Sequence, residues 1–316
     1  MSAFFVFMNE SELKKSIIRT LCYFDIFGHP LTADELYNFL FAPSRISYQD
    51  FLRAMEKMNL NSKFGYYFLE GRECVVENRR RRAPFVDKKL KIARRAARAI
   101  KYVPFVRAMF VCNNVSFEIS DAESDIDVLM IVKSGRIWIA RLLTTVLFSI
   151  LMLRRTKKKI TDRICLSFYL SDRNLNLANI VLKDTDIYMV YWLAQLFPVY
   201  DPDNLASSMR SANKWIENFV PNLSCDEFME KTAKDNLPSR IIKKFFHIAW
   251  GGAYGDVVEK QAKEIQVLKM RMNKASVQDK NDTRVVINDN MLKFHENDRR
   301  ELFRGQWYEK CKQYGV

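Results

Sequence analysis

Two aspartates stand two positions apart at the head of an apolar run, in the stretch SDAESDIDVLMIV of residues 120–132. Side chains alternate between the two faces of a strand, so residues i and i+2 point the same way. Two carboxylates about 4 Å apart repel each other by roughly 4 kcal/mol at an effective dielectric constant near 20. A bound divalent cation would remove that repulsion, so Asp125 and Asp127 predict a metal site. The alternative is an ordinary turn before a buried strand, because Ser, Asp and Glu favour chain reversals.

The segments around this pair indicate a small sheet that positions it. Residues 105–111 and 163–171 read as strands that precede and follow the buried strand at 128–132 along the sequence. The uncharged run at 142–153 predicts a helix that covers the sheet, because a membrane-spanning helix needs about twenty apolar residues. A helix on a membrane surface is the alternative, since five basic residues follow at 154–159.

The N-terminal part predicts three helices and a hairpin. Apolar residues at helical spacing occupy 11–30, and Thr32 with Glu35 forms a capping box that opens a second helix. A third helix is expected at 46–59, and two β-prone runs flank Glu70-Gly71. Three helices followed by a hairpin is the order of a winged helix, a variant of the helix-turn-helix.

Positive charge is concentrated just after this part. The chain carries a net charge of +14, and residues 79–107 hold twelve Lys or Arg against one acid, Asp87. Such a local excess indicates a polyanionic partner, either nucleic acid or an anionic membrane, whereas the alternative is a solvated helix face. The cations expected to contact RNA or DNA are Arg79, Arg80, Arg81, Arg82, Lys88, Lys89, Arg94, Arg95 and Arg98.

Several of these stretches together resemble a known group of proteins. TLCYFDIFGHPLTADELYNFL, then GYYFLEGRE, a basic stretch and the D-x-D strand are similar to bacterial proteins of the DNA polymerase β superfamily that carry a winged-helix-like domain before a nucleotidyltransferase domain. The resemblance implies an α+β protein with a mixed sheet. It divides the chain into a winged-helix-like domain (1–80), a basic connecting helix (81–104), a nucleotidyltransferase core (105–185) and a C-terminal helical region (186–316).

The resemblance also implies a site and an activity. Asp125 and Asp127 would be the catalytic carboxylates and would hold Mg²⁺, or Mn²⁺ in its place, with a nucleoside triphosphate as substrate. The superfamily's Gly-Ser turn falls on Asn113 and Asn114, and Ser124 fits the position before the first carboxylate. Asparagine tolerates a left-handed backbone, so Asn113 can replace glycine there. We therefore expect a nucleotidyltransferase that moves a nucleoside monophosphate to an acceptor.

Two departures from the superfamily pattern keep an alternative open. The Gly-Ser turn is replaced, and the strand at 163–171 lacks the third carboxylate that the superfamily usually supplies. Ser167 stands where that acid is expected, while Asp162 and Asp172 lie at the two ends of the strand. The alternative is a catalytically degenerate protein that senses a nucleotide or binds nucleic acid.

The C-terminal part is expected to be helical from Asp186 onward. The last helix is expected over 291–307, with His295 and Asp298 on one face, and the group resembled above has a similar F-H-x-x-D-x-R tail. The alternative for these two residues is the exposed polar face of a docking helix.

The cysteines and the first residues of the chain predict where the protein is located. Six scattered cysteines without a C-x-x-C pair predict reduced, mostly buried thiols in a cytoplasmic protein. The start MSAFFVFMNE lacks the basic region and cleavage site of a signal peptide, and no transmembrane segment is expected.

Overall fold

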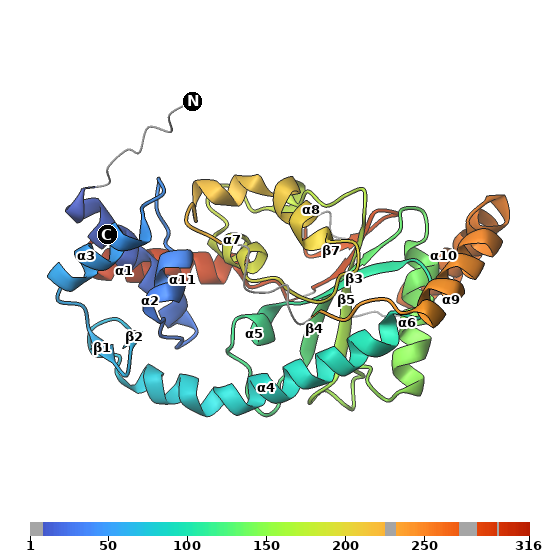
Figure 1. Cartoon of the computed structure of the whole chain (residues 1–316), viewed down its shortest axis with the longest axis horizontal. Coiled ribbons are helices and arrows are strands. Elements are labelled where there is room, and N and C mark those ends of the chain that lie inside the picture. Colours follow the sequence, from blue (N-terminus) through green and yellow to red (C-terminus); the bar gives the residue numbers. More distant parts are fainter. Residues whose placement is uncertain (1–8, 225–231, 272–282, 296) are drawn as a thin grey trace.

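A six-stranded mixed sheet forms the centre of the molecule in a computed structural model that describes residues 9–224, 232–271, 283–295 and 297–316 (Figure 1). The protein is of the mixed α+β class. Strands β4 and β5 are parallel, and the other neighbours are antiparallel. In spatial order the strands are β6 (Phe197–Tyr200), β3 (Val106–Val111), β4 (Ile126–Val132), β5 (Ile164–Ser171), β8 (Met291–Phe294) and β7 (Val285–Ile287).

Helices cover both faces of the sheet, and the alternation of side chains along β4 explains why. Val128 and Met130 pack on one face with residues of α4, α6 and α10, while Leu129 and Ile131 pack on the other with α7, α8 and α11. Asp127 shares the second face, because it lies two residues before Leu129. The helices are α4 (Cys74–Ile100), α6 (Ile137–Ile150), α7 (Ile187–Ala194), α8 (Leu205–Ala212), α10 (Ala253–Arg271) and α11 (Arg300–Gln313).

The N-terminal part has the predicted order of three helices and a hairpin. Helices α1 (Glu10–Ile26), α2 (Ala33–Asn38) and α3 (Tyr48–Lys57) precede the strands β1 (Ser62–Lys63) and β2 (Tyr66–Tyr67). The capping box is confirmed, since Glu35 N donates to Thr32 Oγ1 and Thr32 N donates to Glu35 Oε2. The predicted hairpin turn at Glu70-Gly71 is wrong. The chain reverses at Phe64-Gly65, where both residues have positive φ.

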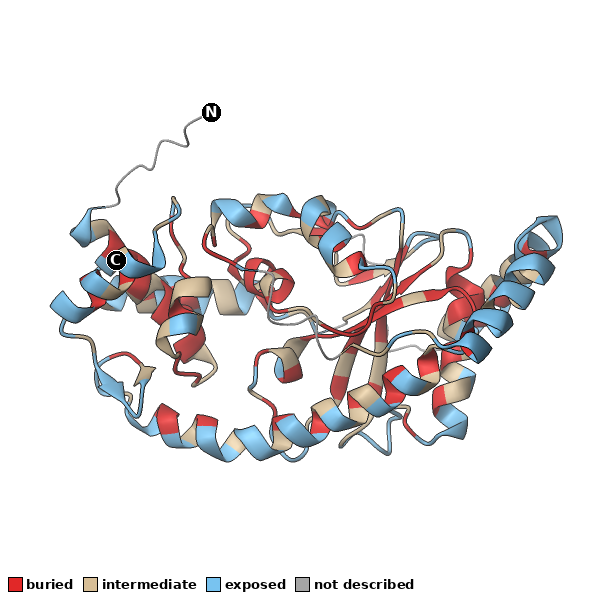
Figure 2. Cartoon of the chain, viewed as in Figure 1, coloured by how far each residue is buried: buried red, intermediate tan, exposed pale blue. Residues whose placement is uncertain are grey.

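Helix α4 is longer than the predicted basic helix. It begins at Cys74, and Figure 1 shows it running from the hairpin along the molecule to the sheet. Two of its predicted nucleic-acid contacts are wrong, because Arg79 and Lys89 are buried in ion pairs. Figure 2 shows the exposed residues of α4 alternating with buried ones along its length.

The C-terminal region is helical only in part. Strands β6, β7 and β8 join the sheet, and the last helix begins at Arg300 and not at 291. Helix α11 returns to the N-terminal helices, where Trp307 Nε1 donates to Arg19 O at 3.0 Å and Lys310 pairs with Asp25. The remaining helical segments are α5 (Asn113–Ser116), η1 (Ala178–Ile180), η2 (Lys214–Asn218) and α9 (Leu237–Trp250).

The predicted cover helix at 142–153 corresponds to α6. Its inner face buries Trp138, Thr144 and Phe148 against the sheet, while Val146 and Ile150 are exposed. No helix in the described ranges is long and apolar enough to cross a membrane. The cysteines at 22, 74, 112, 165 and 311 are free thiols, and Cys225 lies outside the described residues.

Candidate functional site

Asp125 and Asp127 lie together with Cys165 at the start of the parallel strands β4 and β5. The pairing places Asp127 beside Cys165, and one ligand atom from each of the three residues lies within 4.8 Å of the others. Both carboxylates are partly buried. The structure therefore brings the two predicted carboxylates to one point, as their spacing requires.

Asn113 links this point to the neighbouring elements. Its φ is +55°, so the left-handed backbone expected from the sequence is present. The Asn113 amide donates from Nδ2 to Asp127 Oδ2 at 2.9 Å. Its Oδ1 accepts from Trp192 Nε1 at 2.8 Å and from the Tyr188 hydroxyl at 3.2 Å. The turn after β3 thus holds Asp127 in place, and α7 holds the turn. Asn114 is exposed beside it.

The electrostatics of the pair follow from burial and like charge. Burial and the neighbouring Asp125 charge raise the pKa of Asp127 to about 6, against the lowering effect of the Asn113 amide. Burial and both carboxylates raise the pKa of the Cys165 thiol to about 12. At neutral pH the thiol is therefore protonated and uncharged, and it competes weakly for a hard cation such as Mg²⁺.

Arg155 faces the same group from the loop before β5. Its Nη1 lies 2.9 Å from Asp125 Oδ2 and 3.4 Å from Cys165 Sγ. This guanidinium offsets part of the repulsion between the carboxylates.

The turn that carries Asp125 is tied to the basic helix. Lys89, whose side chain is 1% exposed, pairs with Asp162 at 2.7 Å, and Asp162 N donates to Ser124 O at 3.1 Å. The predicted nucleotide ligand Ser124 uses its hydroxyl within the turn, donating to Asp121 Oδ1 at 2.7 Å. The buried Lys89 of α4 thus helps to position the turn that carries Asp125, and it does not belong to the exposed basic surface of the helix.

Cys165, and not Ser167, occupies the strand position beside Asp127. The pairing Asp127–Cys165 is followed by Leu129–Phe168, so β5 carries one extra residue between them. This bulge shifts the register, and the position opposite Asp127 cannot be counted from the sequence alone. Asp162 pairs with Lys88 and Lys89, and Asp172 pairs with Arg107.

A cavity of about 240 Å³ opens beside Asp127. Aromatic residues form much of its wall, namely Phe168, Tyr188, Trp192 and Phe303. Its polar lining includes Asn113 and Asn114 and, from the C-terminal part, Lys293, His295, Asp298 and Arg300. Burial lowers the pKa of His295 to about 4, and its buried Nδ1 has no hydrogen-bond partner among the described residues.

The C-terminal His295 and Asp298 were expected on one face of a helix. The structure places them between β8 and α11, at the cavity that contains Asp127. Asp298 accepts from Arg300, which also donates to Asp186 Oδ2 at 3.0 Å. The F-H-x-x-D-x-R spacing was the sequence signal for these residues, but nothing local predicted that β8 would join the sheet beside β5.

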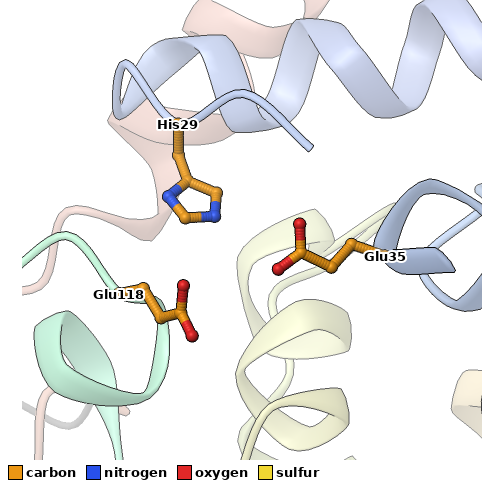
Figure 3. Close-up of side chains that lie close together, drawn as sticks. All are labelled: His29, Glu35 and Glu118. Atoms are coloured by element: carbon orange, nitrogen blue, oxygen red, sulfur yellow. The ribbon is translucent and has the colours of Figure 1, made fainter. Parts of the chain in front are cut away.

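A second group of possible metal ligands lies away from this site. His29, Glu35 and Glu118 face one another where the N-terminal helices meet the turn after α5 (Figure 3). Arg79 supplies the positive charge that a metal ion would bring to these carboxylates, because its Nη2 lies 2.5 Å from Glu35 and 2.8 Å from Glu118. Burial and the Arg79 charge lower the pKa of His29 to about 3. The group is therefore an ion-paired junction between two parts of the chain.

The residues at Asp125 and Asp127 fit one hard divalent cation. Two carboxylates supply oxygen ligands of the kind that Mg²⁺ or Mn²⁺ takes, and the contact to Asp125 Oδ2 is the Arg155 guanidinium at 2.9 Å, a cation where a metal would supply one. Mg²⁺ keeps several waters and shares phosphate oxygens, so two protein carboxylates suffice.

Comparison with known proteins gives no match. No family model, no curated protein and no solved structure matches the chain.

Proposed function

We propose that the protein is a nucleotidyltransferase, which binds a nucleoside triphosphate with Mg²⁺ at Asp125 and Asp127 and transfers the nucleoside monophosphate to an acceptor. The observation that carries the proposal is the geometry of this pair. Two carboxylates meet on one face of the sheet, beside a left-handed turn and an open cavity. We also propose that the sheet has the polymerase β-type arrangement and that the N-terminal part is winged-helix-like, which the order of the elements supports.

Each residue of the site has a part in this proposal. Asp125 and Asp127 supply the oxygen ligands, and Asn113 fixes the orientation of Asp127 through its 2.9 Å hydrogen bond. The metal, when bound, stabilises the attacking and leaving oxygens at the phosphorus. Arg155 offers a guanidinium to the phosphate oxygens, at the cost of part of its pairing with Asp125.

The cavity restricts how the substrates lie. Ligand pockets for whole drug-sized molecules are typically about 300–1,000 Å³, whereas this cavity is about 240 Å³. We place a single planar ring against the aromatic wall that contains Phe168, Tyr188 and Trp192, with the phosphates outside near Asp125. Aromatic side chains suit a planar ring because stacked faces bury apolar area with favourable geometry.

Release of pyrophosphate tests the proposal. Purified protein with Mg²⁺ and each of ATP, GTP, CTP and UTP, supplied with total RNA or a deproteinised cell extract as acceptor, should release pyrophosphate from at least one nucleotide. Asp127→Ala should abolish the release. Glu123→Ala is the matched control, because Glu123 is an exposed acid of the same turn. Release by Asp127→Ala equal to that of the parent would show that the site is assigned wrongly.

A second candidate is a nucleotide-binding protein without turnover. The observation in its favour is Cys165, a protonated thiol at the strand position where a third carboxylate would help to ionise the acceptor hydroxyl. Nucleotide binding that depends on Mg²⁺, with no pyrophosphate released from any nucleotide, would favour this candidate.

A further inference from the structure

Helix α9 exposes an apolar stripe on its outer face. Leu237, Ile241, Phe245 and Ile248 follow one another at intervals of four, four and three residues, and they are 71, 58, 65 and 73% exposed. Residues at such intervals lie on one face of a helix. The inner face of α9 is marked by Ser239, which is buried, and by Lys243, which donates to the Tyr200 hydroxyl. The stripe therefore points away from the body of the protein.

Helix α10 repeats this arrangement. Its inner face packs against α6, where Gln266 accepts from Arg141 and donates to Trp138 O. Its outer face exposes large side chains, with Tyr254 67%, Val257 52%, Ile265 64% and Leu268 66% exposed. Figure 2 shows both helices largely exposed at the end of the molecule opposite α1–α3. Single exposed apolar residues are ordinary, but two neighbouring stripes indicate a surface that binds something.

The charge beside the α9 stripe favours one kind of partner. Helix α9 contains Arg240, Lys243 and Lys244 and no acid, whereas α10 carries both acids and bases. Arg240 and Lys244 are exposed, and they adjoin the α9 stripe on the helix surface. Apolar side chains next to exposed Lys and Arg are the features of a helix that lies in the interface of an anionic membrane.

We propose that the outer surface of α9 and α10 binds the surface of a membrane that contains anionic lipid. The apolar stripes enter the boundary between headgroups and acyl chains, and Arg240 and Lys244 contact lipid phosphates. Spanning is excluded for α9 by its length, since its 14 residues extend about 21 Å at 1.5 Å per residue, less than the hydrocarbon core.

A second copy of the chain fits this surface less well. A two-fold interface sets the same patch against itself, so the cations Arg240 and Lys244 of α9 would face the same cationic surface in the other copy. The whole chain also carries a net charge of +14, which opposes self-association.

Vesicle flotation with the full chain tests the proposal. The protein should float with phosphatidylcholine vesicles that contain about one third phosphatidylglycerol and should remain unbound with phosphatidylcholine alone. Binding should weaken at about 0.5 M salt, where charge is screened over a few ångströms. The double variant Ile241→Glu/Phe245→Glu should bind at least about tenfold more weakly, because it places two charges in the apolar stripe.

Two controls keep the result interpretable. Leu302→Glu on α11, at a residue 54% exposed, makes the same chemical change at another surface and should bind as the parent does. The double variant should melt within a few degrees of the parent, since surface changes cost little stability. Equal binding by the double variant, or no binding of the parent to anionic vesicles, would overturn the proposal. So would a lipid-free dimer, seen by light scattering, that the double variant abolishes, because it would assign the surface to a second copy.

Discussion

At the scale of single residues, Asn113 connects the backbone, the carboxylate and α7. It has a φ of +55° and takes part in hydrogen bonds with Asp127, Tyr188 and Trp192. The sequence allowed this conformation, because asparagine tolerates the left-handed region better than most residues do. The sequence did not reveal the two donors from α7, which lie 75 and 79 positions away.

Two substitutions at Asn113 separate its backbone role from its side-chain role. Asn113→Gly keeps the positive φ without strain and loses the hydrogen bonds, whereas Asn113→Ala loses the hydrogen bonds and is strained at positive φ. We expect Asn113→Ala to be less stable than Asn113→Gly by about 1 kcal/mol, because alanine is strained at positive φ. Urea denaturation of the two variants measures the difference. Asn114→Ala, at the exposed neighbour, should stay close to the parent. Equal stability of the glycine and alanine variants would mean that the turn relaxes.

Cys165 shows where counting along a strand fails. The absence of an acid from residues 163–171 was correctly read from the sequence. The residue beside Asp127 was not, because it is Cys165 and not the expected Ser167, and the extra residue in β5 shifts the register between this pair and Leu129–Phe168 by one position. A bulge depends on the partner strand as much as on the bulged one, so the local sequence does not determine it.

At the scale of elements, α4 has two distinct sets of cations. Arg79 and Lys89 are buried, and they hold the N-terminal junction and the loop before β5. The exposed set lies along the solvent side of the helix and consists of Arg80, Arg81, Lys88, Lys91, Arg95 and Arg98, of which Lys88 also pairs with Asp162. Charge density in the sequence predicted a polyanion surface, but only burial separates the residues that can contact a partner from those that hold the fold.

The exposed set predicts salt-dependent binding of single-stranded nucleic acid. With six phosphate contacts, log affinity should fall with log salt at a slope near −4, since each contact contributes about 0.7 on single strands. Lys91→Ser/Arg95→Ser/Arg98→Ser removes three contacts and should flatten the slope to about −2. Fluorescence anisotropy with a labelled oligonucleotide over a salt series measures it.

A control for this titration is Arg53→Ser on α3, where the side chain is 73% exposed. It should leave the slope unchanged. Arg79 is left intact because its loss would break the pairs with Glu35 and Glu118. If the parent does not bind at about 50 mM salt, where the electrostatic contribution is strong, the exposed face of α4 is simply solvated.

Helices and strands were predicted well where nearby residues determine the conformation, and poorly where pairing with a strand distant in the sequence determines it. The capping box of α2, the apolar strands β3 and β4 and the helix α6 follow from periodicity and capping residues. The stretch 291–294 was expected to be helical, yet it forms β8 because β5 offers a free edge for antiparallel pairing. Short apolar segments of this kind take their conformation from the sheet they join.

At the scale of the whole molecule, the C-terminal part contacts elements that are distant from it in the sequence. Helix α11 packs against α1, with Trp307 Nε1 donating to Arg19 O and Lys310 pairing with Asp25. The residues between β8 and α11 line the cavity at Asp127. The candidate site thus includes residues from Asn113 to Phe303. An analysis of one segment at a time could therefore predict its carboxylates but not the cavity wall that the C-terminal part supplies.

The most direct test of the account is calorimetric titration of the full chain with each of the four nucleoside triphosphates, in Mg²⁺ and again in EDTA. At least one nucleotide should bind in Mg²⁺. Removing the metal should weaken nucleotide binding at least about tenfold. Asp125→Asn or Asp127→Asn should have the same effect, because each substitution replaces a negatively charged ligand of the cation with a neutral amide. Glu123→Asn should bind as the parent does. Absence of binding by every nucleotide in Mg²⁺, or binding by either aspartate variant with the affinity of the parent, would contradict a metal-dependent nucleotide site at Asp125 and Asp127.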